Sequence, residues 1–250
     1  SSIKKAAEYG YHGVELALKE ASDVDTRELE KLLNKYDLEV SCISSGQVFA
    51  SLNIYFTHPD PEVRKRVTEV FTGLINLAKD YGRIVNIGRV RGFYAKDQSK
   101  EDTEKFFVET AQRICDVAAK VGVTIIIEPV NRYEINFINS VDEGADLVKK
   151  IDRPNCGLMP DVFHMNIEDA RIGESFIRNA DLVKYVHLAD SNRWAPGQGH
   201  LDFDEVFSSL KKAGFDNWTS IEILPYPDPD TAAKQAAEFI LPRIKEYNAT

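Results

Sequence analysis

Short apolar runs alternate along the chain with longer segments in which apolar residues recur at helical spacing. The short runs predict buried parallel strands, because such strands are apolar on both faces. They cover residues 13–17, 40–44, 84–88, 124–128, 156–161, 183–187 and 219–222. The longer segments predict helices. These cover residues 3–9, 25–36, 61–81, 100–121, 140–151, 204–213 and 230–247, with Pro242 expected to interrupt or kink the last and with short, irregular helix expected over 166–181.

The alternation of strands and helices predicts a (β/α)₈ TIM barrel that forms a single domain over residues 1–250. A doubly wound open sheet is the competing fold, but no GxGxxG motif follows any predicted strand. The chain opens on a helix, whereas a barrel of this type opens on a strand. We therefore expect the first strand to be missing from this sequence. A seven-stranded barrel is the alternative, and it would leave an unpaired sheet edge.

Charge and composition narrow the classes of function. The net charge is −9, from 31 basic and 40 acidic residues, which argues against nucleic acid as a partner because phosphate binding needs a basic surface. No apolar stretch approaches the length of a membrane span, and no signal-peptide pattern is present. The three cysteines are odd in number and lack CxxC spacing, as expected for reduced thiols of a cytoplasmic protein.

Four predicted strands end in a side chain that can bind a metal ion. These side chains are Glu128, Asp161, His187 and Glu222. A single strand-end carboxylate is usually just solvated, but the C-terminal ends of barrel strands meet at one face, so four in succession favour a metal centre. The oxygen-rich set suits a hard or borderline divalent cation.

Three residues in the loops beyond these strands are candidates for substrate binding. His164 lies three residues after Asp161, so we expect it on the following loop, and we favour a substrate contact over a fifth metal ligand, a supporting contact or simple packing. Glu134 lies six residues after Glu128 and can return over the site. Arg193 carries a fixed cation suited to hydroxyl, carboxylate or phosphate oxygens, with a surface salt bridge as the alternative.

Two further cations follow predicted strands and would matter for an acidic substrate. Lys19 follows the strand at 13–17, and Arg91 follows the strand at 84–88. Either could anchor the carboxylate of a keto sugar acid if it points into the pocket. The alternative for each is a solvated loop charge.

Several segments carry a family resemblance. They are EPVNRYE (128–134), FINS (137–140), DVFHMNIE (161–168) and ADSNRWAPGQGH (189–200). They are similar to motifs of the xylose-isomerase-like sugar isomerase/epimerase superfamily, and more closely of its ketose 3-epimerase branch, which includes tagatose and psicose 3-epimerases. With Gly46-Gln47 and Thr57-His-Pro59 added, the chain looks most like 5-keto-L-gluconate epimerase-like members. The resemblance covers the whole length apart from the missing strand.

The resemblance implies one divalent ion, Mn²⁺ first and Co²⁺, Mg²⁺ or Zn²⁺ as alternatives, held by the four strand-end residues. It implies that Glu128 and Glu222 transfer protons, and that Glu134, His164 and Arg193 bind the substrate. It also implies a small-molecule sugar or keto sugar acid as substrate, and a homodimer or homotetramer as the assembly.

We therefore expect a metal-dependent epimerase that inverts C3, the carbon next to the ketone of a ketose or keto sugar acid. Two carboxylates would move the proton through a metal-stabilised enediolate, with Glu222 as base and Glu128 as acid in one direction. An aldose–ketose isomerase and an inosose dehydratase are alternative enzymes. Endonuclease IV-like DNA repair needs several zinc ions and a basic, His-rich site, which this acidic chain lacks. A degenerate or truncated sugar-binding barrel is the non-enzyme alternative.

Overall fold

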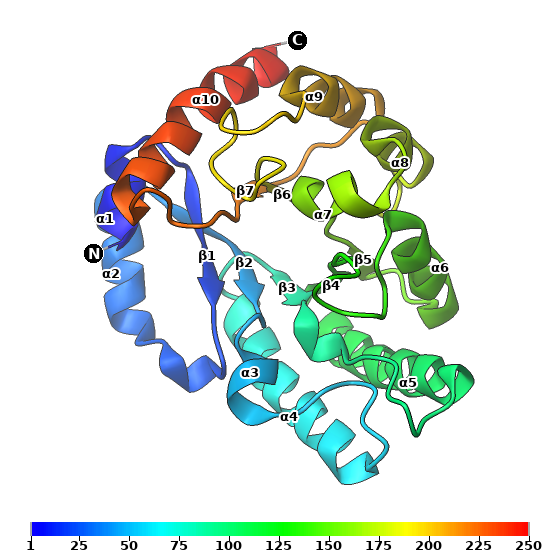
Figure 1. Ribbon diagram of the computed structural model, residues 1–250. Coiled ribbons are helices and arrows are strands. Elements are labelled where there is room, and N and C mark those ends of the chain that lie inside the picture. Colours follow the sequence, from blue (N-terminus) through cyan, green and yellow to red (C-terminus); the bar gives the residue numbers. More distant parts are fainter. Residues whose placement is uncertain (1, 250) are drawn as a thin grey trace.

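Parallel strands form the inner layer of the molecule, and helices surround them (Figure 1). The structure is a computed structural model that describes residues 2–249. Its first sheet pairs five strands in chain order, β1 (Gly13–Ala17), β2 (Glu39–Ser44), β3 (Ile84–Ile87), β4 (Thr124–Ile127) and β5 (Cys156–Leu158). The second sheet pairs β6 (Val186–Leu188) with β7 (Thr219–Ile221).

Two isolated parallel bridges join the two sheets. In one, Leu158 pairs with Val183, and in the other, Asp161 pairs with His187. The strands therefore follow one another round the ring in sequence order. That order is the winding of a TIM barrel, and it confirms the predicted fold class over a doubly wound sheet.

The outer layer contains long helices that alternate with the strands, as predicted, and several shorter ones. Among residues 2–249 the helices are α1 (Ser2–Glu8), α2 (Thr26–Tyr36), α3 (Val48–Leu52), α4 (Pro61–Ala78), α5 (Lys100–Ala119), α6 (Val141–Ile151), α7 (Val162–Glu168), α8 (Ile172–Arg178), α9 (Phe203–Lys212) and α10 (Pro229–Ala249), with single 3₁₀ turns η1 (Ala21–Asp23) and η2 (Arg89–Arg91). Many of them begin at a side chain that accepts backbone N–H bonds of the first turn, which fixes their starts. These capping residues include Asp25, Asp60, Ser99, Ser140, Asp161 and Asp202.

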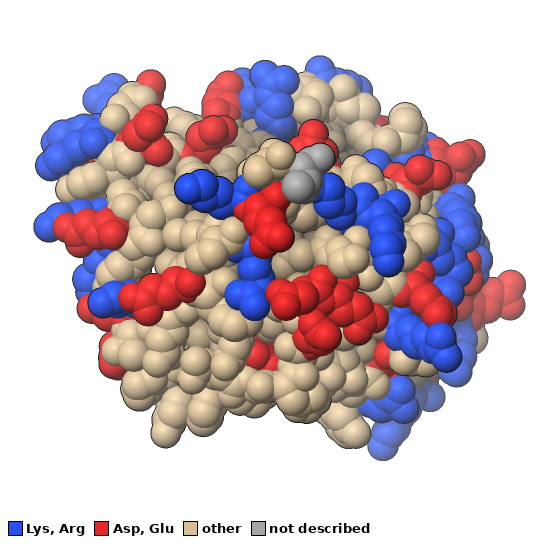
Figure 2. All heavy atoms as spheres, turned by 90° about the horizontal axis from the view of Figure 1, so that it is seen from above, with Lys and Arg blue, Asp and Glu red and all other residues tan. Residues whose placement is uncertain are grey.

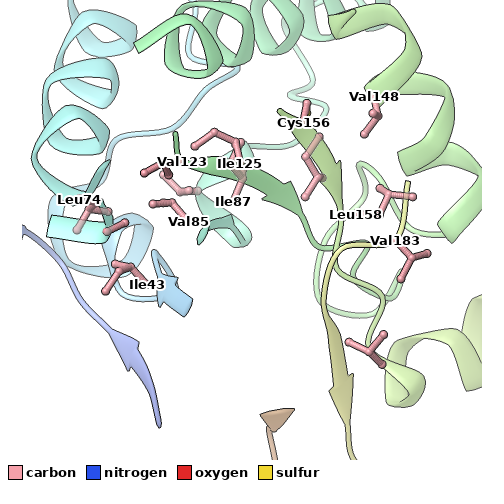
Figure 3. Close-up of a cluster of buried hydrophobic side chains, with 14 of the residues drawn as sticks. Ile43, Leu74, Val85, Ile87, Val123, Ile125, Val148, Cys156, Leu158 and Val183 are labelled. Carbon is pink, nitrogen blue, oxygen red and sulfur yellow. The ribbon is translucent and has the colours of Figure 1, made fainter. Parts of the chain in front are cut away.

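The main core lies between the strands and the surrounding helices (Figure 3). Strand β4 shows how the alternation of side chains divides the interior. Ile125 and Ile127 belong to this outer core, whereas Ile126 packs inside the ring with Cys42 and Met159. Because successive side chains of a strand point to opposite faces, a fully apolar run can fill both layers.

The ring is not closed by backbone pairing among the described residues. Strands β1 and β7 are neighbours in no sheet. Instead, the ring of Trp218 packs against Gly13, where an added Cβ would come within 3.2 Å of the indole. A cavity of about 710 Å³ lies at this junction and is lined by Gly13 and Glu15 on one side, Trp218 on the other, and Ile240 of α10. A strand that completes the ring stays a prediction.

The segment between residues 46 and 61, for which no helix or strand was predicted, contains α3, because Val48 is buried and anchors a short turn. The short helix expected over 166–181 is confirmed, and it is divided between the end of α7 and the whole of α8. An interruption of the last helix at Pro242 was wrong, since α10 continues through this residue. Proline has no N–H group, so Pro242 cannot donate to the carbonyl of Glu238, four residues earlier. Both residues are exposed, and water can bond to that carbonyl instead.

The surface charges and the cysteines are arranged as the composition led us to expect. Acidic and basic side chains lie next to one another over the face shown in Figure 2. Cys42, Cys115 and Cys156 are buried and free. Within residues 2–249 we find no helix with the length and apolar character needed to cross a membrane. Ser1 and Thr250, the ends of the expected domain, lie outside the described residues.

Strand β5 offers a test of how tightly the ring is packed. Replacing Gly157 by Ala would place a Cβ 2.8 Å from the Leu182 carbonyl oxygen and even closer to Lys184. We expect Gly157→Ala to lower the free energy of unfolding by about 1–3 kcal/mol, measured by urea denaturation. Gly46→Ala is the control, since its Cβ would meet only Ser44 at 3.6 Å. Equal stability of the two variants would contradict the tight packing.

Candidate metal centre and active site

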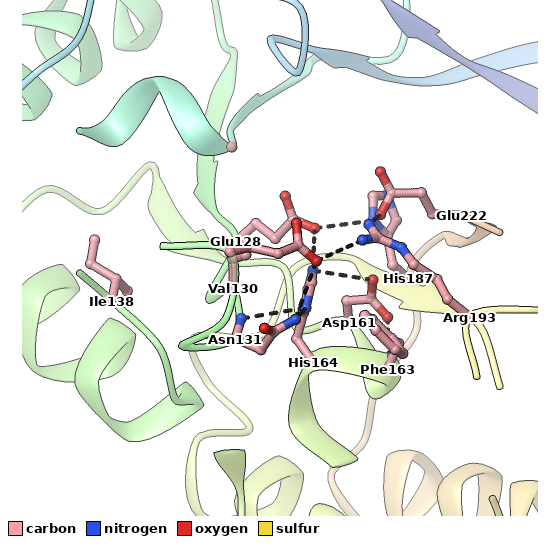
Figure 4. A network of polar contacts seen from close by, with 12 residues as sticks. Glu128, Val130, Asn131, Ile138, Asp161, Phe163, His164, His187, Arg193 and Glu222 are labelled. Atoms are coloured by element: carbon pink, nitrogen blue, oxygen red, sulfur yellow. Dashed lines mark hydrogen bonds and ion pairs between the residues drawn. The ribbon is translucent and has the colours of Figure 1, made fainter. Parts of the chain in front are cut away.

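The four strand-end side chains meet at one point of the ring, as predicted. Glu128 directly follows β4, Asp161 lies at the start of α7 beyond β5, His187 lies in β6, and Glu222 directly follows β7. One ligand atom from each lies within 4.8 Å of the other three. In Figure 4 these side chains point toward a common centre.

The donor set fits a divalent cation. Asp161 Oδ2 and His187 Nδ1 are buried and lack a hydrogen-bond partner. His187 Nδ1 lies 3.6 Å from Glu128 Oε1 and 3.5 Å from Glu222 Oε2. Buried polar atoms normally have partners, so two orphaned ligand atoms in one cluster mark a position that a cation would satisfy. Three carboxylates and one imidazole suit Mn²⁺-type ions.

Electrostatics of the cluster indicate the same need for positive charge. Burial, and then the charge of Glu222, raise the pKa of Glu128 and raise that of Asp161 well above its usual value. Burial opposes the charged form of His187, yet Glu15 and Glu128 raise its pKa well above the ordinary range. A bound divalent cation would offset this concentration of acidic groups.

Glu222 differs from Glu128 in its surroundings. Its side chain is 46% exposed, whereas that of Glu128 is only 9% exposed. Burial alone would favour the protonated form of Glu222, but His187 and Arg193 lower its pKa. The surroundings therefore shift the pKa values of the two glutamates in opposite directions.

His164 lies beside the cluster, but on α7 and not on the predicted loop. Helix α7 starts immediately after Asp161, whose side chain accepts the backbone N–H of Phe163 and caps it. His164 Nδ1 accepts from the backbone and side-chain N–H groups of Asn131, at 3.4 and 2.8 Å, so Nε2 carries the proton. Nε2 lies 3.8 Å from Asp161 and 4.0 Å from Glu128. Burial, and then Arg193, lower the pKa of His164 to about 3, which keeps the ring neutral.

Arg193 and Glu134 lie together next to Glu222. Arg193 Nη1 donates to Glu134 at 2.8 Å, and Nη2 donates to Glu222 at 3.0 Å. The guanidinium also lies over the ring of Phe163, 5.0 Å from its centre. Asn131 donates to the same Glu134 oxygen at 3.2 Å. Arg193 is thus part of the site and not an isolated surface ion pair.

Lys19 and Arg91 make no direct polar contact with the four ligands among residues 2–249. Lys19 is exposed and lies 3.8 Å from Asp23. Arg91 is fully buried, and it donates to the carbonyl oxygens of Ile138 and Gly88. In the described part of the chain, no hydrogen bond or ion pair links either to the ligand cluster. Their roles as substrate contacts stay predictions.

Two residues of the site were not assigned a role from the sequence. Asn131 lies inside the motif at 128–134, which was its only signal, and it joins His164 to Glu134. Glu15 lies in the middle of β1 and contacts His187. A charged residue in the centre of an apolar strand was a visible signal, because that position faces either the helices or the ring interior.

Comparison with known proteins identifies the family. The model of the xylose isomerase-like TIM barrel family matches residues 3–243. The chain belongs to this family. The resemblance of the motifs to the xylose-isomerase-like superfamily is thereby confirmed.

Several relatives of this chain are sugar epimerases. An L-ribulose 3-epimerase from Methylomonas sp. (strain DH-1) is 30% identical over 246 residues, which cover 97% of this chain and 80% of that protein. A 3-dehydro-D-guloside 4-epimerase from Escherichia coli (strain K12) is 31% identical over 122 residues, 48% of this chain and 47% of that protein. The crystal structure of a D-allulose 3-epimerase from Methylomonas sp. in complex with D-allulose has a TM-score of 0.84 and 28% identity, covering 97% of this chain and 90% of that one.

Metal binding can be tested at Asp161. In Asp161→Asn the remaining amide oxygen can still cap α7, but the charged ligand atom is lost. We expect Mn²⁺ to stabilise the chelator-treated parent protein, by about 2.7 kcal/mol at a hundred times its Kd, and to stabilise the variant much less. Thermal unfolding with and without Mn²⁺ measures this. Asp25→Asn, at the cap of α2, is the matched control and should keep the full response. An undiminished Mn²⁺ response in Asp161→Asn would rule out this ligand.

Proposed function

We propose that the protein is a divalent-metal-dependent epimerase that inverts C3 of a ketose or keto sugar acid. The observation that carries the proposal is the pair Glu128 and Glu222, which face one cation site from the ends of β4 and β7 and whose pKa values are shifted in opposite directions. Inversion next to a ketone needs one group that removes a proton and another that returns one to the opposite face. Two carboxylates whose pKa values are pushed apart suit these roles.

Each glutamate is prepared for one role. Glu222 is partly exposed, and His187 and Arg193 lower its pKa, so it can reach the substrate carbon and accept its proton. Glu128 is buried with a raised pKa, so it can hold the proton that is returned. In the reverse direction the roles exchange. A divalent ion held by Glu128, Asp161, His187 and Glu222, for which we propose Mn²⁺, would polarise the ketone oxygen as a Lewis acid.

Three neighbouring side chains can orient the sugar. The neutral ring of His164 presents an Nε2–H group beside Glu128 and Asp161, and this group can donate to a substrate hydroxyl. Glu134 can accept from a hydroxyl, and the forked guanidinium of Arg193 can donate to adjacent oxygens. Contacts that hold the carbon within reach of both carboxylates supply much of the rate of such a reaction.

The relatives favour epimerisation over isomerisation, since the epimerases reported above act at C3 or C4. The proposed carbon is C3, as in the L-ribulose and D-allulose enzymes. A keto sugar acid of the 5-keto-L-gluconate type, a cytoplasmic location and a homodimer or homotetramer remain predictions.

Isotope exchange identifies the carbon that reacts. We expect the Mn²⁺-loaded protein, incubated in D₂O with a panel of ketohexoses and keto-hexonates, to place deuterium at C3 of its substrate, detected by NMR. Exchange between C1 and C2 would instead indicate an aldose–ketose isomerase, and loss of water would indicate a dehydratase. Absence of exchange with every compound would contradict the proposed substrate class.

Glu222 is the proposed base in one direction and can be tested in the same assay. We expect Glu222→Gln to lower the rate of C3 exchange by about 10²–10⁴-fold, because the amide cannot accept the proton. The assay is run at saturating Mn²⁺, verified by metal analysis, so that loss of a ligand is separated from loss of the base. Glu238→Gln, an exposed glutamate of α10, serves as the control. A Glu222→Gln variant with unchanged exchange would refute this role.

A further inference from the structure

A carboxylate lies behind the metal cluster, on the far side of His187. Glu15 Oε2 of β1 is 2.9 Å from His187 Nε2 of β6. His187 is 1% exposed, and the Glu15 side chain is 15% exposed. The two residues are 172 positions apart in the chain, and the ring brings them together.

This contact determines which nitrogen of His187 faces the cluster. A carboxylate accepts hydrogen bonds, so the short contact places the proton on Nε2. In the neutral ring Nδ1 then keeps a free lone pair, and it is the atom that is buried without a hydrogen-bond partner, 3.5 Å from Glu222 and 3.6 Å from Glu128. A metal ion binds the unprotonated nitrogen of an imidazole, so the contact selects the tautomer that can bind one.

Glu15 is itself held from a second side. Tyr185 is fully buried just before β6, and its hydroxyl donates to Glu15 Oε2 at 3.1 Å. Ser41 Oγ of β2 lies 2.7 Å from the Tyr185 oxygen and can donate to it. The chain Ser41–Tyr185–Glu15–His187 therefore links β1 and β2 to the strand that carries the ligand, and leaves the carboxylate little freedom to turn.

We propose that Glu15 is a positioning residue of the metal centre, which fixes His187 with Nδ1 directed at the ion, and that Tyr185 holds Glu15 in place. This inference rests on the proposed metal site. Carboxylates that accept the second N–H of a metal-bound histidine orient the ring and increase its basicity, and their loss typically costs about 10–100-fold in metal affinity.

Two variants of Glu15 separate the effect of its hydrogen-bond acceptor from the effect of its negative charge. Glu15→Gln keeps an acceptor oxygen without the negative charge, and Glu15→Leu removes both. We expect the Kd for Mn²⁺, measured by titration calorimetry on the full chain, to rise about tenfold in Glu15→Gln and about a hundredfold in Glu15→Leu. Glu39→Gln, an exposed glutamate at the start of the neighbouring β2, is the matched control and should bind like the parent.

A spectroscopic measurement distinguishes positioning from a general loss of structure. We expect the visible absorption bands of bound Co²⁺ to shift in Glu15→Leu and to stay unchanged in Glu39→Gln, because only the former frees the His187 ring. Should Glu15→Leu fail to fold, Tyr185→Phe tests the same network, since it keeps the packing and removes the donor to Glu15. We expect Tyr185→Phe to fold like the parent protein and to raise the Kd for Mn²⁺ several-fold.

The outcomes are distinct. A parent protein that binds no Mn²⁺ would overturn the metal site itself, and the proposed function with it. A parent that binds Mn²⁺, together with Kd values within twofold of it in Glu15→Gln and in Glu15→Leu or Tyr185→Phe, would overturn only the positioning role of Glu15.

Discussion

Concentrated negative charge at the open end of the ring is the constraint on which the site depends. Glu128 and Asp161 are buried beside Glu222, and burying charges is costly unless each has a partner. His187 and Arg193 supply part of the compensation, and the orphaned atoms at the centre mark where a cation would supply the rest. The parallel strands make this arrangement accessible, because their carboxyl ends all point to the same face.

The same constraint gives two glutamates, Glu128 and Glu222, different electrostatic surroundings. Glu128 lies in the interior, where desolvation favours its protonated form. Glu222 lies at the rim, where His187 and Arg193 favour its ionised form. Asn131 extends this organisation by bonding to both Glu134 and His164, so that a single amide connects the arginine side of the pocket to the neutral histidine. An asymmetric proton-transfer pair thus follows from position in the ring and not from residue type.

Much of the site was predictable because the fold converts a local pattern into a spatial one. An apolar run that ends in Glu128 or His187 predicts both a strand and the location of its last residue. Contacts between non-adjacent strands were not predictable, since the spacing of β1 and β6 in sequence does not indicate that Glu15 meets His187. The helix that carries His164 was also missed, because Asp161 acts both as strand-end residue and as helix cap. Arg91 could not be placed, because its burial depends on carbonyl groups of the loop after β4.

The link between Glu15 and His187 also bears on how the ring is held together. Strands β1 and β7 do not pair among residues 2–249, so contacts across this junction come from side chains. On the outside, Lys5 bonds to Asp230, and the Tyr11 hydroxyl donates to the Ala233 carbonyl at 2.7 Å. On the inside, Glu15 reaches His187 directly. Because a ligand of the cluster is one end of that inner contact, the orientation of His187 depends on the position of β1. A change that moved β1 outward would displace Glu15 first, and with it the restraint on His187.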